Sequence, residues 1–200
     1  TIGFFNLEVL EMLLEMLTQQ LGGNTVKDIG KQLGLSPQQA SGALASALPM
    51  LVGALAKNSA STEGASSLNR ALEKDHDGSI LDNLSGFLGN SASGPGDGIL
   101  KHVLGNRRSS VEGALAKTSG LGSEQMGSLL AMLAPIVMGA LGKAKRQEGL
   151  DSAGLSNLLA GERKRVAKDN STMGMLALLD ADGDGSIMDD VAGLMDKFFK

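Results

Sequence analysis

The residues with the clearest chemical pattern lie near the C-terminus, in the run Asp180-Ala-Asp-Gly-Asp-Gly-Ser-Ile. Carboxylates at alternating positions can point toward one hard cation, and glycine at the sixth place allows the sharp turn of an EF-hand calcium loop. The twelfth position, Val191, lacks the bidentate glutamate that this loop uses. The sequence therefore predicts calcium as a cofactor at an incomplete site, whose ligands are Asp180, Asp182, Asp184, Ser186, Asp189 and Asp190.

A shorter echo of this loop lies upstream. The run Asp75-His-Asp-Gly-Ser-Ile-Leu-Asp repeats the pattern of Asp182-Gly-Asp-Gly-Ser-Ile-Met-Asp. Glu73, Asp75 and Asp77 hold its alternating places, but its twelfth position is Leu84. The upstream run is therefore the weaker calcium candidate.

Helix capping is the alternative explanation for both aspartate loops. Ser79 with Asp82, and Ser186 with Asp189, have the spacing of a capping box. Acidic residues in a first helical turn also interact favourably with the helix dipole. Calcium binding and capping without metal both remain open at this point.

Other catalytic or ligand-binding patterns are absent from the sequence. The chain has no cysteine, which removes disulfides, thiolate metal sites and cysteine nucleophiles. His76 and His102 are its only histidines, so a zinc site would need carboxylates as well, and two ordinary surface histidines are the alternative. No serine lies in a nucleophile elbow, and the run Gly94-Pro-Gly-Asp-Gly lacks the lysine of a phosphate loop. These patterns favour a protein that is not an enzyme.

Composition and charge narrow the class of partner. The net charge of −4 argues against a nucleic-acid surface. Basic clusters at 143–146 and 163–168 have no interleaved aromatic residues, so we interpret them as solvated helix faces. A hydrophobic fraction of 42% is enough for a buried core. The compartment stays open, with the cytoplasm placed ahead of a secreted or surface location.

Two related segments organise the rest of the chain. Residues 34–57 read GLSPQQASGALASALPMLVGALAK and residues 120–143 read GLGSEQMGSLLAMLAPIVMGALGK, with ten of 24 positions identical. Each segment is apolar on nearly every side, which is typical of a buried helix or a membrane span. The second has only about 14 strongly apolar residues, against the ~20 that span a bilayer. We therefore predict buried helices and no transmembrane segment, with Pro49 and Pro135 causing a kink or a restart, near Ser46 in the first copy.

The order of segments predicts the fold. A polar linker, an aspartate loop and an amphipathic helix follow each apolar segment, as expected after duplication of one helical unit, and no stretch alternates as a strand does. We predict an all-α fold, a helical bundle or partial superhelix built from two related halves. An N-terminal apolar helix covers 1–23, the first half 24–98 and the second half 99–200, in one compact unit. Residues 58–67 are predicted as a polar loop, and the Gly/Ser-rich residues 89–98 as a flexible boundary.

Several runs carry a family resemblance. Together ALEKDHDGSILDNLSGFLG, DGILKHVLG, LAPIVMGALGK and LLDADGDGSIMDDVAGLMDKFF resemble the bacterial proteins grouped as domain of unknown function 937, related to the YidB-like helical proteins. The resemblance covers roughly residues 24–199. It implies an all-α bundle or partial superhelix of bacterial origin, and it implies no activity and no catalytic residue.

The two ends of the chain predict self-association. Four of the five phenylalanines lie there, at Phe4, Phe5, Phe198 and Phe199, and we predict that these residues form an interface. Packing of both ends on their own chain is the alternative. Small residues on the apolar segments also allow close helix approach: Gly42, Ala45, Ser46, Gly53, Gly127, Ala131, Gly139 and Gly142. The predicted function is a non-enzymatic bacterial structural or interaction protein that forms a homo-oligomer or filament, and the alternative is a calcium-binding helical module that uses the DADGDGS loop.

Overall fold

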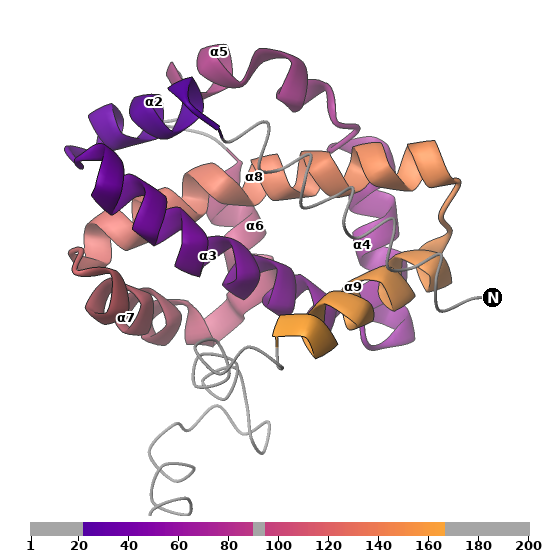
Figure 1. The fold of residues 1–200 in the computed structure, drawn as a ribbon. Coiled ribbons are helices and arrows are strands. Elements are labelled where there is room, and N and C mark those ends of the chain that lie inside the picture. The colour runs from indigo at the N-terminus through magenta and orange to yellow at the C-terminus, as the bar shows by residue number, and fades with distance from the viewer. Residues whose placement is uncertain (1–21, 90–94, 167–200) are drawn as a thin grey trace, which may run out of the picture.

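The computed structural model describes residues 22–89 and 95–166, and the regular structure within these ranges is entirely helical (Figure 1). The elements are α2 (Asn24–Leu33), α3 (Pro37–Asn58), α4 (Thr62–Lys74), the 3-10 helix η1 (Ser79–Asn83), α5 (Leu84–Gly89), α6 (Gly96–Leu104), the 3-10 helix η3 (Gly105–Arg107), α7 (Arg108–Ser119), α8 (Ser123–Glu148) and α9 (Ser152–Val166). The predicted all-α class is confirmed.

The two apolar segments form the two longest of these helices, α3 and α8. Helices α2, α7 and α9 pack along α3, while α4, α6 and α7 pack along α8 (Figure 1). By length and composition both α3 and α8 could cross a membrane, but 61% and 78% of their apolar windows are buried inside the fold. Such burial is typical of a helix in a hydrophobic core. The absence of a transmembrane segment stays a prediction.

Both core helices continue through their internal prolines. Helix α3 runs unbroken past Pro49 and α8 past Pro135, so a restart near Ser46 is wrong, while the alternative, a kink, stays a prediction. A proline removes one helical hydrogen bond. Burial of residues directly after each proline, Met50 in α3 and Ile136 in α8, supplies the tertiary packing that keeps these helices continuous.

The starts of the core helices follow the local sequence signals. The Ser36-Pro-Gln-Gln spacing predicts a capping box, and it is confirmed: Ser36 Oγ accepts from the Gln39 backbone N–H at 3.3 Å, and Gln39 Oε1 accepts from the Ser36 N–H at 3.0 Å. Gly122 has no side chain, so α8 keeps half of this arrangement: Gln125 Oε1 accepts from the Gly122 N–H at 3.1 Å. The Gln125 Nε2 group donates to the carbonyl of Leu33 at 3.1 Å and so ties the start of α8 to the end of α2.

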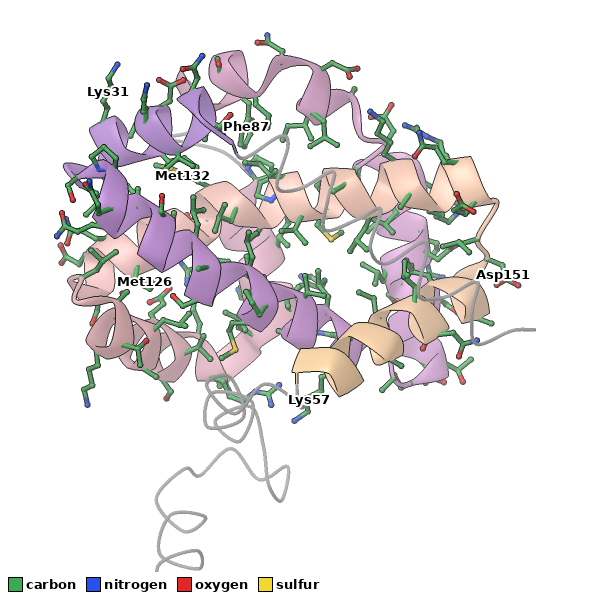
Figure 2. The ribbon with its side chains drawn as sticks, in the orientation of Figure 1. Lys31, Lys57, Phe87, Met126, Met132 and Asp151 are labelled. Carbon is green, nitrogen blue, oxygen red and sulfur yellow. The ribbon has the colours of Figure 1, made fainter. Side chains whose placement is uncertain are left out.

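Two helices are longer than the sequence indicated. Helix α4 begins at Thr62, where Ser61 Oγ accepts from the Gly64 N–H at 3.1 Å, so the loop predicted over 58–67 is wrong. The small and polar residues at the start of α4 do not by themselves indicate a helix, and the burial of Ala65 and Leu68 depends on tertiary contacts. The sequence predicts only one or two helical turns over residues 155–159, but helix α9 spans Ser152–Val166. Asp151, at the turn between α8 and α9 (Figure 2), caps α9 by accepting from the Gly154 N–H at 2.7 Å.

The segments assigned to the two halves pack directly on one another. Helix α3 of the first half lies against α9 and α7 of the second. Ser156 Oγ on α9 donates to the carbonyl of Ser59 at 2.8 Å, directly after α3. The origin of the fold by duplication, with a boundary between 98 and 99, stays a prediction.

Candidate functional site

Most of the predicted site residues lie outside the described residues. The predicted calcium ligands there are Asp180, Asp182, Asp184, Ser186, Asp189 and Asp190, and the predicted interface residues are Phe4, Phe5, Phe198 and Phe199. Calcium binding and self-association through these residues therefore stay predictions. The described part of the chain contains the upstream aspartate loop and an apolar cavity beside it.

The carboxylates of the upstream loop interact with α8 instead of gathering around one point. Glu73 Oε1 lies 2.9 Å from Lys145 Nζ, and Asp77 Oδ2 lies 3.5 Å from Arg146 Nη1. The hydrogen bond from Lys145 lowers the pKa of Glu73. Within the ranges that the structure describes, no group of three or more His, Asp or Glu side chains is placed to hold a metal ion. The basic cluster at 143–146 is thus partly a structural partner of the loop, and Lys145 keeps only 12% of its side chain exposed.

The capping of this loop also differs from the prediction. Gly78, with φ of 91°, occupies the cap position before η1, and no side chain caps that helix. Asp77 Oδ1 instead accepts from the Ser79 N–H at 3.0 Å, and the Ser79 hydrogen bonds lower the pKa of Asp77. The predicted capping box of Ser79 with Asp82 is therefore wrong. The chain turns too tightly at Gly78 for Ser79 to serve as the cap residue.

Glycines bring the backbone of the loop directly against α8. A Cβ atom at Gly142 would overlap the carbonyl oxygen of His76, and one at Gly139 would overlap Ile80. A Cβ at Gly78 would lie 2.9 Å from the Cβ of Lys143. The predicted close approach at Gly139 and Gly142 therefore occurs inside this fold. In contrast, Gly42 on α3 is exposed with open space beside it.

An apolar cavity opens beside this contact. Its volume is about 520 Å³, within the range of 300–1,000 Å³ that small-molecule sites have. It lies between α3, α4, α6, α8 and the segment after α4. Aliphatic side chains form its wall: Leu55, Leu68, Ala71, Ile99, Val103 and Met138. Its polar lining includes Asn58, Asp75, His76 and His102.

Asn58, in the last turn of α3, fixes the position of α6 at the cavity. Its Nδ2 group donates to the carbonyls of His102 and Val103 at 3.0 and 3.3 Å. These carbonyls belong to the last turn of α6, where helical partners run out. The hydrogen bonds of Asn58 therefore hold two cavity walls at a defined separation.

Both histidines of the chain line this one cavity, which the sequence reasoning missed. His76 comes from the loop after α4 and His102 from α6. Nothing in the sequence indicates their proximity beyond their being the only histidines. His76 is half-buried, and this burial lowers the pKa of its ring, so the ring is neutral at pH 7.

The half-buried ring of His76 predicts a pH dependence of stability. Below its ordinary pKa of 6.5 the unfolded state takes up a proton before the folded state does, so the free energy of unfolding should fall as the pH drops through this value. The folded pKa values of Glu73 and Asp77 are lowered, so the stability that their ionised forms contribute is lost only when the pH falls below their ordinary pKa values of 4.5 and 3.8. Urea denaturation between about pH 5 and pH 8 measures the slope. His76→Gln should flatten this slope, and an unchanged slope in His76→Gln would contradict the assignment.

A second hollow, of about 570 Å³, lies between α6, α7 and α8 and is lined partly by charged groups. Arg108 Nη2 lies 2.6 Å from Asp97 Oδ1, and Arg108 Nε lies 2.7 Å from Glu112 Oε1. The hydrogen bond to Glu112 raises the pKa of Arg108. Arg108 is held between these two carboxylates in structural ion pairs, so the apolar cavity is the better candidate for a ligand.

Comparison with known proteins assigns a family. The model of a family described as "Bacterial protein of unknown function (DUF937)" matches residues 15–144. The match contains both apolar segments, the upstream aspartate loop and every residue of the apolar cavity, while the loop from Asp180 lies beyond it. No curated protein and no solved structure matches the chain. The relation to YidB-like proteins stays a prediction. The extension of the resemblance to residue 199 also stays a prediction, but the family itself is confirmed, and the chain belongs to the bacterial DUF937 family.

Proposed function

We propose that this chain is a non-enzymatic bacterial interaction protein that binds an apolar molecule in the cavity between α3, α4, α6 and α8. The observation that carries the proposal is the cavity itself, an aliphatic-walled space of about 520 Å³ that opens to solvent. Removing apolar surface from water stabilises a complex by about 25 cal/mol per Å². A ligand that fills this space would gain that free energy without a large change in the fold.

The charged groups nearby support binding rather than chemistry. Glu73 pairs with Lys145, and Asp77 pairs with Arg146, so both carboxylates serve to hold the loop on α8. The polar groups that line the cavity are few and lie beside an aliphatic wall. This combination of an apolar interior and a few fixed polar groups is typical of ligand pockets.

The two histidines provide a direct assay. Toluene, a small apolar probe, should shift the ring Cε1–H NMR signals of both His76 and His102, because both line the cavity. Ala71→Trp places a large ring in the cavity and should abolish the shifts. Glu63→Trp, at an exposed position on the same helix, should leave them unchanged.

A second cavity-filling variant keeps the test decisive if Ala71→Trp does not fold. If Ala71→Trp loses its helical circular dichroism, Gly98→Leu fills the same cavity from α6, where a Cβ meets nothing within 4 Å. Toluene shifts that persist in a folded filled variant, or that are absent in the parent protein, would overturn the proposal.

A further inference from the structure

We infer that the ligand of this cavity is an aliphatic amphiphile whose head group is a hydrogen-bond donor, either a neutral hydroxyl or a cationic amine, and not an anion. The inference rests on the proposed function and names the chemical class that the cavity would take. It follows from the walls of the cavity and from the charges that line it.

The walls favour an aliphatic body over a flat aromatic one. Leu55 and Leu68 face the space from α3 and α4, and Ile99 and Met138 face it from α6 and α8. Apart from the two histidine rings, none of the described residues that line the cavity is aromatic. Flexible aliphatic side chains adapt to an alkyl chain but offer no ring face for stacking.

The polar groups of the cavity favour a donor as head group. Asp75 is exposed and, when ionised, can only accept hydrogen bonds. The neutral ring of His76 next to it offers one acceptor nitrogen and one N–H, with no positive charge. A hydroxyl or an ammonium group can donate to both residues.

The same charges disfavour an anionic head group. Among the described residues that line the cavity, none is Lys or Arg. The cations near the loop, Lys145 and Arg146, are paired with Glu73 and Asp77. A carboxylate in the cavity would therefore meet the charge of Asp75 without a compensating cation, and the interaction of unit charges at a few ångströms changes affinity by about tenfold or more.

Three ligands with the same alkyl chain test the inference: 1-decylamine, 1-decanol and decanoate, each titrated as a monomer at neutral pH. The ring signals of His76 and His102 report binding. We expect decylamine to bind most tightly, decanol next, and decanoate at least about tenfold more weakly than decylamine. Asp75→Asn should reduce this ratio to about twofold. Asp82→Asn, which removes the same charge from a residue outside the cavity, should leave it unchanged.

Equal affinities, tighter binding of decanoate, or a ratio unaffected by Asp75→Asn would overturn the inference. If toluene still shifts the histidine signals in any of these cases, the proposed function survives and only the head-group assignment fails. If toluene produces no shift, the proposed function fails as well. Binding of toluene without binding of any of the three amphiphiles would also overturn the inference.

Discussion

Replacing Gly142 by alanine should lower the free energy of unfolding by about 3 kcal/mol or more, at the upper end of the range for overpacked cores. The added Cβ would overlap the carbonyl oxygen of His76, which is a backbone atom and cannot rotate away. Relief of this overlap requires the loop and α8 to separate. Separation would also disturb the packing of Ile80 on Gly139 and the ion pair of Lys145 with Glu73.

Urea denaturation followed by circular dichroism at 222 nm measures this effect. Gly113→Ala is the matched control, because Gly113 lies inside α7 and a Cβ there meets nothing within 4 Å. The control should be stabilised by up to about 1 kcal/mol, through the higher helix propensity of alanine. A Gly142→Ala protein as stable as Gly113→Ala would show that the loop does not lie on α8 as described.

The second large effect is expected at Gly96, the first residue of α6. A Cβ at this position would overlap the carbonyl oxygen of Ala131 in α8, so Gly96→Ala should destabilise the fold by about 2–3 kcal/mol. Gly98, two positions later on the same helix, has open space around its Cβ direction. Gly98→Ala should therefore be neutral or slightly stabilising.

Thermal unfolding of the two variants side by side separates packing from chain flexibility. The sequence predicted that residues 89–98 form a flexible boundary, and in a flexible segment both alanine substitutions would have similar, small effects. A clear loss at Gly96 with no loss at Gly98 is the expected result. Equal melting temperatures for Gly96→Ala and Gly98→Ala would instead support a flexible linker at residues 96–98.

The features that sequence alone could predict are those with local physical causes. The capping box of Ser36 with Gln39 depends on residues three apart in the chain. Gly34 and Gly120 end α2 and α7 in the left-handed conformation, with φ of 66° and 70°, as glycine after a helix often does. The apolar character of the two core helices likewise predicted that they are buried, without identifying the helices that pack on them.

The features that sequence could not predict depend on partners far away in the chain. The start of α6 at Gly96 is defined by the backbone of Ala131, and the close contact at Gly142 is defined by the backbone of His76. Glycine allows a close approach at these positions, but backbone atoms have no side-chain identity, so the sequence does not indicate which backbone segment makes the contact. The cavity could not be predicted for the same reason, because His76 and His102 come to line one space only when four helices pack around it.

His76 contributes to two parts of the molecule at once. Its carbonyl oxygen lies against Gly142, and its ring lines the apolar cavity. A shift of the His76 peptide unit would therefore change both the outline of the cavity and the distance between the loop and α8. Relatives that retain the glycine in α8 should for this reason also retain the position of this peptide unit beside the cavity.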